Sequence, residues 1–200
     1  MTLFTDATGL DLARLLRPGD RIVMGQACGE PTTLVEALIA QGKDIGGLSA
    51  FIATSFSGLF TPGTAASFAL SSMGAIGALR GMTKAGKLAV IPAHVSQIGP
   101  MITAGIIGCD VAFIQVSPAD EKGNHSCGLI SDHVRAAVDR ARVVIAEVNE
   151  QVPHTPGETI PAASIDVAVQ VSRAPVEVPA GRISETDQAI ARHCAAYIGD

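Results

Sequence analysis

The sequence predicts an α/β domain built on an open, mostly parallel sheet that is flanked by helices. Short apolar runs suited to buried strands alternate along the 200 residues with segments that carry helix caps and helical spacing. Hydrophobic residues make up 48% of the chain and charged residues 16%, which is enough apolar material for a sizeable core. Aromatic residues make up only 4%, so Ala, Val, Ile and Leu must fill the layers between helices and sheet.

The first unit is a strand, a glycine-bearing turn and a helix. The strand is expected at Arg21–Met24 and the turn at residues 25–30. Pro31 suits the first position of a helix that runs to Gln41, and Gly42 is expected to end that helix. Backbone N–H groups point outward at such a helix start, so the turn is either a cradle for a small ligand or a plain strand-to-helix connection.

The later segments continue this alternation. Apolar runs predict buried strands at residues 48–54, 88–91, 111–116 and 142–148, and a half-exposed edge strand at 165–171. Capping residues predict helices from Thr5 or Asp6 to Leu16, from Ser96 to Gly105, from Ser131 or Asp132 to Ala141, and from Glu185 to Tyr197 behind Ser184 and Asp187. Residues 125–129 are expected to form a short hairpin arm. Residues 61–86 hold no period for long and are predicted as loop with one or two short helices.

The carboxyl ends of these strands predict the location of a binding site. Ligands of a parallel sheet bind at that edge, and the expected strand ends here are polar or small. Topology should gather several of them at one edge, and the residues that we expect to form a substrate pocket there are Gly25, Gln26, Cys28, Gly29, Glu30, Ser55, Ser57, His94 and Gln97.

Several of these residues also have a structural interpretation. The Ser55 and Ser57 hydroxyls suit a substrate carboxylate, and they equally suit the capping of their own loop. His94 either enters the pocket with Gln97 or makes a structural hydrogen bond. Cys28 forms a conceivable thioesterase pair with His94, whereas a small packed thiol is the simpler interpretation.

Two glutamates are candidate nucleophiles of another kind. Glu147 lies within an expected strand and Glu150 follows its end. Either would need a pKa raised by burial to react, and ion pairing or loop hydrogen bonding is the alternative. Asp120 and Asn149 are expected to fix turns. The histidines and cysteines show no metal-ligand spacing, so no metal site is predicted.

Charge and hydropathy argue against several classes of protein. The net charge is −5 and there is no Trp, which disfavours nucleic-acid and acidic-membrane binding. The N-terminus has no basic region followed by an apolar core, so no signal peptide is expected. Gly, Pro, Ser or charge breaks each apolar stretch before it reaches about 18 residues, so no membrane span is expected. The four cysteines show no CxxC pair, which indicates the reduced thiols of a cytoplasmic protein.

Several segments are similar to motifs of a known family. They are Pro18-Gly19-Asp20, Gly29-x-Pro31, residues 110–123 (DVAFIQVSPADEKG), Gly128-Leu129, residues 141–150 (ARVVIAEVNE), residues 152–157 (VPHTPG) and residues 183–191 (ISETDQAIA). On these residues the chain resembles the N-terminal half of the acetyl-CoA hydrolase/transferase family. These are the type I CoA-transferases, which include 4-hydroxybutyrate, acetate and butyrate CoA-transferases. Residues 61–86 carry no such motif.

The resemblance implies a fold, a reaction and a division of labour. It implies a CoA-transferase N-terminal domain over residues 1–182, with residues 183–200 as a helix that leads to a second domain. It implies ping-pong transfer of CoA from an acyl-CoA to a small carboxylate, through a glutamyl-CoA thioester on a glutamate of the family's second half. Coenzyme A and acyl-CoA are then substrates. No residue here matches the glutamate motif, so no catalytic residue is assigned to this chain.

The expected partner is therefore a second CoA-transferase domain or subunit, or another copy of the chain. The chain is either the N-terminal part of a longer protein or a subunit whose partner supplies the other half, and we expect it to be inactive alone. The alternative function is a module that binds acyl-CoA or a partner without turnover. A Cys28-dependent thioesterase is a weaker alternative.

Overall fold

The computed structural model, which describes residues 2–4 and 9–199, confirms the α/β fold. In these residues eight strands form one sheet in the order β1-β10-β8-β6-β2-β3-β4-β5, and all neighbours are parallel. The strands of this sheet are β1 Thr2–Phe4, β2 Arg21–Met24, β3 Ser49–Phe51, β4 Ala69–Ser72, β5 Leu88–Val90, β6 Val111–Val116, β8 Val143–Asn149 and β10 Val167–Val171. Two further strands, β7 (Asn124–Ser126) and β9 (Thr159–Pro161), pair antiparallel beside it.

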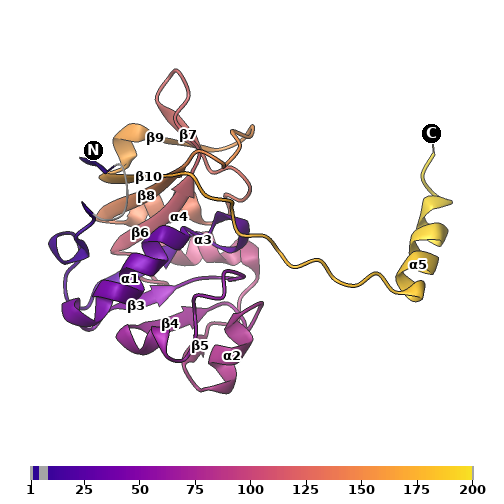
Figure 1. Cartoon of the computed structure of the whole chain (residues 1–200), viewed down its shortest axis with the longest axis horizontal. Coiled ribbons are helices and arrows are strands. Elements are labelled where there is room, and N and C mark those ends of the chain that lie inside the picture. The colour runs from indigo at the N-terminus through magenta and orange to yellow at the C-terminus, as the bar shows by residue number, and fades with distance from the viewer. Residues whose placement is uncertain (1, 5–8, 200) are drawn as a thin grey trace.

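Helices cover both faces of the large sheet (Figure 1). They are α1 Thr32–Ile45, α2 Leu79–Lys84, α3 Val95–Thr103 and α4 Val134–Arg140. A further helix, α5 Glu185–Ala195, follows near the C-terminus, and 3₁₀ turns lie at Leu12–Arg14, Ala27–Gly29, Thr64–Ser67 and Ala162–Ser164. One core cluster joins α1 and α2 to one face, and the other joins α3 and α4 to the opposite face. In β2, Ile22 and Met24 belong to the first cluster and Val23 to the second, because successive strand residues point to opposite faces.

The order of the strands reverses between β2 and β6. From β2 the chain adds β3, β4 and β5 outward in one direction, and it then returns to place β6 on the other side of β2. Two backbone hydrogen bonds tie the turn after β2 to both neighbours: Gly25 N donates to Phe113 O at 2.9 Å, and Ala27 N donates to Thr54 O at 3.0 Å. Ligands of open α/β sheets bind at such a switch point, at the carboxyl ends of the strands.

The structure confirms the predicted bounds of β2 and β6 and corrects the end of α1. Gly42 was expected to end that helix, but it lies inside it, where a Cβ atom would come within 3.3 Å of Leu38 and 3.5 Å of Leu48. Gly42 therefore packs closely against these two leucines inside the helix. The helix continues to Gly46, whose φ of +83° is a conformation that glycine adopts without strain.

Two predictions about strands were wrong. Residues 61–86 contain β4 as well as the 3₁₀ turn at Thr64–Ser67 and α2. The strand predicted at 165–171 as an edge is β10, an interior strand, because β1 pairs on its outer side. Of the arm predicted at 125–129, only residues 125 and 126 belong to a strand, β7, and its partner β9 was not predicted.

The helix predicted up to Leu16 is a single 3₁₀ turn at Leu12–Arg14. Its predicted caps, Thr5 and Asp6, lie outside the described residues. Asp11 caps the turn instead, by accepting a hydrogen bond from Ala13 N at 3.1 Å. The Gln41 side chain of α1 binds Leu12 N at 2.8 Å and Leu10 O at 3.0 Å, which fixes the backbone in a turn.

The last helix stands apart from the domain. An extended segment after Arg173 leads to α5, which begins with the predicted capping box of Ser184 and Asp187. Figure 1 shows α5 at the far end of this segment, and none of its residues is buried. Within the described residues, no helix is both long and apolar enough to cross a membrane.

Candidate functional site

The turn after β2 and the segment after β3 meet around a buried carboxylate. Glu30 is 0% exposed, and its two carboxylate oxygens accept hydrogen bonds from Ser55 Oγ at 2.9 Å and Ser57 Oγ at 2.6 Å. Burial raises the pKa of Glu30, and the two hydroxyl donors partly offset that rise. The hydrogen bonds from Ser55 and Ser57 to Glu30 therefore hold the loop after β3 against the turn after β2. Ser57 also lines an open hollow.

Close packing shapes the turn at residues 25–30. A Cβ atom on Gly25 would lie 2.4 Å from the backbone oxygen of Gly29, and a Cβ on Gly29 would lie 2.5 Å from Ile130 Cγ2. Ala27 has a φ of +49°, which is unusual for a residue with a side chain. The turn is therefore a strained, tightly fitted segment, a feature that is often found at functional sites.

The residues before α4 hold the same turn from the other side of the sheet. His133 Nε2 lies 2.9 Å from Met24 O, and Gln26 Nε2 donates to the Asp132 carboxylate. Asp132 has a φ of +38°. His133 is 2% exposed, and its Nδ1 atom has no partner among the described residues. Burial lowers the pKa of its imidazole and favours the neutral ring with a proton on Nε2.

A buried polar ladder lies under the start of α1. Gln115 Nε2 donates to Cys28 O at 3.0 Å, and Asn149 Nδ2 donates to Gln115 Oε1 at 3.2 Å. Sequence reasoning missed the role of Gln115, and its only signal was a polar residue within an otherwise apolar strand. Asn149 also holds Arg173, accepting from its backbone N at 3.2 Å and donating to its carbonyl oxygen at 2.8 Å.

Glu147 belongs to this region but is closed off from solvent. It is 0% exposed, and Oε2 accepts a hydrogen bond from Thr33 N at 2.7 Å at the N-terminus of α1. Oε1 has no partner among the described residues, and burial raises the pKa of the carboxyl. These contacts match the interpretation of Glu147 as a loop and helix hydrogen-bond acceptor. Glu150 is exposed.

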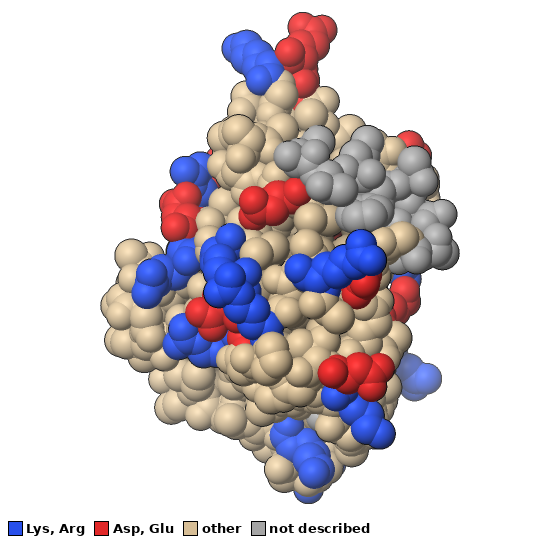
Figure 2. Space-filling model, turned by 90° about the vertical axis from the view of Figure 1, so that its left-hand side faces the viewer, with Lys and Arg blue, Asp and Glu red and all other residues tan. Residues whose placement is uncertain are grey.

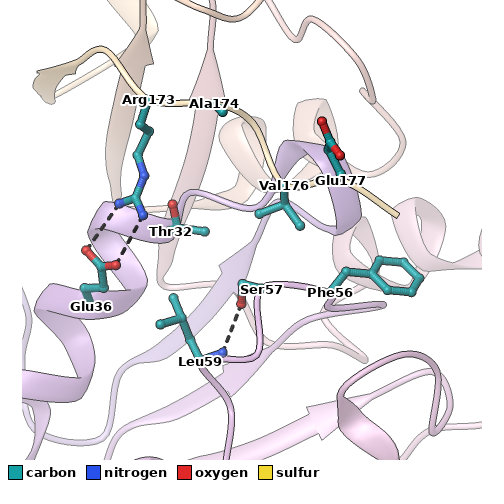
Figure 3. Close-up of a pocket in the computed structure, with 9 residues that line it drawn as sticks. All are labelled: Thr32, Glu36, Phe56, Ser57, Leu59, Arg173, Ala174, Val176 and Glu177. Carbon is teal, nitrogen blue, oxygen red and sulfur yellow. Dashed lines mark hydrogen bonds and ion pairs between the residues drawn. The ribbon is translucent and has the colours of Figure 1, made fainter. Parts of the chain in front are cut away.

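A hollow of about 270 Å³ opens beside Ser57 (Figure 3). Its lining residues come from α1, from the loop after β3 and from the start of the C-terminal segment: Thr32, Glu36, Phe56, Ser57, Leu59, Arg173, Ala174, Val176 and Glu177. Figure 3 shows Arg173 and Glu36 paired at one end and Phe56 and Glu177 at the other. Sequence reasoning did not predict that residues after β10 reach this site.

His94 and Gln97 lie at the start of α3, away from the hollow's lining. Both are exposed, and Gln97 Oε1 accepts a hydrogen bond from His94 N at 3.1 Å, which is a helix-capping contact. No hydrogen bond in residues 9–199 joins Cys28 to His94. Their assignment to a substrate pocket stays a prediction.

The remaining thiols and ionisable clusters offer less reactivity. All four cysteines are free thiols, and burial raises the pKa of Cys109 to about 12 and that of Cys127 to about 11. No group of three or more metal-binding side chains occurs in the part of the chain that the structure describes. On the face shown in Figure 2, basic and acidic side chains are interspersed over a largely uncharged surface.

Comparison with known proteins identifies this domain. The family model described as the acetyl-CoA hydrolase/transferase N-terminal domain matches residues 7–178. The chain is 30% identical over 183 residues to the 4-hydroxybutyrate coenzyme A transferase of Clostridium kluyveri, covering 90% of this chain and 43% of that protein.

Solved structures agree on the fold. RipA from Yersinia pestis matches with a TM-score of 0.88 at 23% identity, over 100% of this chain and 49% of that one. The 4-hydroxybutyrate CoA-transferase from Porphyromonas gingivalis matches with a TM-score of 0.74 at 24% identity, over 100% and 46%. The chain thus spans about half the length of these relatives. It belongs to the acetyl-CoA hydrolase/transferase family and forms that family's N-terminal domain.

Proposed function

We propose that this chain is the N-terminal half of a CoA-transferase that moves CoA between an acyl-CoA and a small carboxylate acceptor. The proposal rests on one observation above the others. The fitted turn at residues 25–30 and the loop carrying Ser57 meet at the switch point of the sheet, beside an open hollow. Family membership and the names of the relatives give the reaction class.

In this proposal the chain supplies one wall of the reaction cavity and no nucleophile. Gly25, Gln26, Cys28 and Gly29 form the part of the wall nearest the sheet, with Glu30 and Ser55 holding it from beneath. His94 and Gln97 extend it from α3. A glutamate of the second half would attack the thioester carbonyl, and CoA would pass through a covalent thioester to the acceptor.

Two features suit this division of labour. Both glutamates near the turn are fully buried and already accept hydrogen bonds, so neither carboxylate is free to reach a substrate in this arrangement. The chain matches 43% of the length of the Clostridium kluyveri relative, which leaves room there for a further domain. Coenzyme A is a substrate in this scheme.

Reconstitution tests the proposal. The chain is assayed for CoA exchange between butanoyl-CoA and acetate, alone and after addition of the second half of the Clostridium kluyveri relative expressed as a separate polypeptide. We expect no turnover from either polypeptide alone and turnover from the mixture. Robust exchange by this chain alone would overturn the assignment of the nucleophile to the second half.

A second candidate function is a module that binds a partner or acyl-CoA without turnover. The exposed apolar side chains of the C-terminal segment favour it, because Ile183 is 77% exposed, Ile190 56%, Tyr197 92% and Ile198 78%. Such side chains suit a covering partner, a second half or another copy of the chain. Sedimentation of the chain alone tests whether another copy of the chain covers these side chains. A monomer at all concentrations would count against self-association.

A further inference from the structure

The hollow beside Ser57 combines apolar walls with uncharged polar groups. Leu59, Val176 and the ring of Phe56 supply the apolar surface, and Thr32 and Ser57 supply hydroxyls (Figure 3). At about 270 Å³ the hollow is large enough for a chain of a few carbon atoms. It adjoins the Glu30–Ser57 contact, so it is continuous with the candidate site.

The positive side chain that lines this hollow, Arg173, already has protein partners. Arg173 pairs with Glu36 through both terminal nitrogens, with Nη1–Oε2 at 3.2 Å and Nη2–Oε1 at 3.3 Å. Arg173 Nη1 also donates to Thr33 Oγ1 at 3.1 Å. These contacts engage three of the five N–H groups of the guanidinium, including both on Nη1, and its charge is balanced by Glu36.

The N-terminus of α1 is occupied in the same way. A helix N-terminus ordinarily attracts anions through its free N–H groups. Here Thr33 N already donates to the buried carboxylate of Glu147 at 2.7 Å. The lining of the hollow contains one positive side chain, Arg173, and two negative ones, Glu36 and Glu177. An additional anionic group would therefore meet a net negative wall whose positive side chain is already paired with Glu36.

We propose that this hollow binds the distal end of the acyl group and selects short acyl chains that end in an uncharged group over those that end in a carboxylate. The inference rests on the proposed CoA-transferase function and adds its substrate class. Discrimination arises because Glu36 both occupies Arg173 and repels a second carboxylate. The specificity therefore depends on the Arg173–Glu36 pair, the ion pair that the described residues form at the hollow.

Butanoyl-CoA and succinyl-CoA form a matched pair of probes. Their acyl groups have the same carbon chain, and they differ at the far end by a methyl group against a carboxylate. We expect the reconstituted enzyme to favour butanoyl-CoA in kcat/KM. The variant Glu36→Gln frees the guanidinium, so succinyl-CoA should gain by about threefold relative to butanoyl-CoA, as for a partly exposed ion pair.

Two further variants make the result interpretable. Glu36→Gln combined with Arg173→Gln should lose the gain, because the freed guanidinium is then absent. Glu121→Gln removes the same charge from an exposed position outside the hollow and should leave the preference unchanged. An equal preference in wild type and Glu36→Gln, or a gain that persists without Arg173, would overturn the proposal.

Binding separates this inference from the proposed function. Calorimetry with the chain alone measures the affinity for both thioesters without any turnover. If exchange fails on reconstitution but butanoyl-CoA still binds more tightly than succinyl-CoA, and Glu36→Gln narrows the difference, the specificity stands and the transferase assignment falls. If wild type and Glu36→Gln each bind the two thioesters with equal affinity, the proposed specificity is wrong, whatever the exchange assay shows.

Discussion

The two ends of the parallel sheet hold their charges in opposite ways. At the amino ends, Arg21 and Asp110 form a pair through two hydrogen bonds, at 2.7 and 2.9 Å, and both side chains are partly exposed. At the carboxyl ends, Glu30 and Glu147 are fully buried, and neither forms an ion pair within the described residues. Removing an unpaired carboxylate from water costs free energy, whereas an exposed pair is close to neutral.

This difference indicates which end of the sheet contains the features that lower the free energy of unfolding. At the amino end, the carboxylates of Asp110 and Asp20 each pair with an arginine, Arg21 and Arg142 respectively. In the part of the chain that the structure describes, the carboxyl end keeps buried carboxylates, an imidazole nitrogen without a partner and two non-glycine residues with positive φ. Such features persist where a precise arrangement is needed for binding or chemistry. The contrast therefore supports the placement of the functional site at the carboxyl edge.

The largest expected effect comes from two matched glycine substitutions, one at each edge. A Cβ on Gly25 would lie 2.4 Å from the backbone oxygen of Gly29, and a Cβ on Gly108 would lie 2.3 Å from Arg21 Cδ. Backbone cannot move aside, so Gly25→Ala should lower the free energy of unfolding by about 3 kcal/mol or more. The Arg21 side chain can move at the expense of an exposed ion pair, so Gly108→Ala should cost about 1 kcal/mol or less.

Chemical denaturation of both variants measures this difference. Circular dichroism of the folded state serves as the control, since each variant must reach a native baseline. Equal losses at the two positions would contradict the view that the turn at residues 25–30 is the more tightly constrained segment.

A smaller effect, of opposite sign at the two edges, is expected from pH. Burial raises the pKa of Glu30 above its ordinary 4.5, so its contribution to stability is complete below pH 4.5 and is lost as pH rises through the raised value. The hydrogen bonds from Arg21 lower the pKa of Asp110 below its ordinary 3.8, so its contribution is complete above pH 3.8 and is lost as pH falls through the lowered value.

Unfolding free energies across pH test both statements. The difference between wild type and Glu30→Gln should shrink as pH rises from 4.5, and the difference between wild type and Asp110→Asn should shrink as pH falls below 3.8. Parallel trends for the two variants would show that the two edges do not differ in how they hold charge.

Local sequence was enough to predict the strands nearest the site. The apolar runs of β2 and β6 end sharply in glycine, charge or proline, so their bounds could be predicted. Gly42 shows the limit of local signals, since a glycine that ends a helix and a glycine that packs inside one look alike in sequence. Only the contacts of Gly42 with Leu38 and Leu48 distinguish them. Strand β4 was missed because buried Ser72 satisfies its hydroxyl through Ala53 O, a tertiary contact.

The sequence could indicate which edge of the sheet carries the candidate site, but it could not indicate the contacts within that site. Polar strand ends pointed to the turn after β2 and to the serines after β3. That Ser57 binds Glu30 across 27 residues, or that Gln115 binds Cys28 across 87, depends on strand order. Arg173 follows β10 and reaches the hollow because β10 lies beside β8. The prediction of an edge strand at 165–171 did not indicate this neighbour.

The most direct test of the account is to locate the covalent intermediate. The reconstituted enzyme is treated with butanoyl-CoA and then with borohydride, which reduces a glutamyl thioester to an alcohol, and its peptides are analysed by mass spectrometry. We expect the modified glutamate on the second half and none on residues 1–200. A reduced side chain on this chain, at Glu30, Glu147 or elsewhere, would contradict the claim that it supplies only a wall of the cavity.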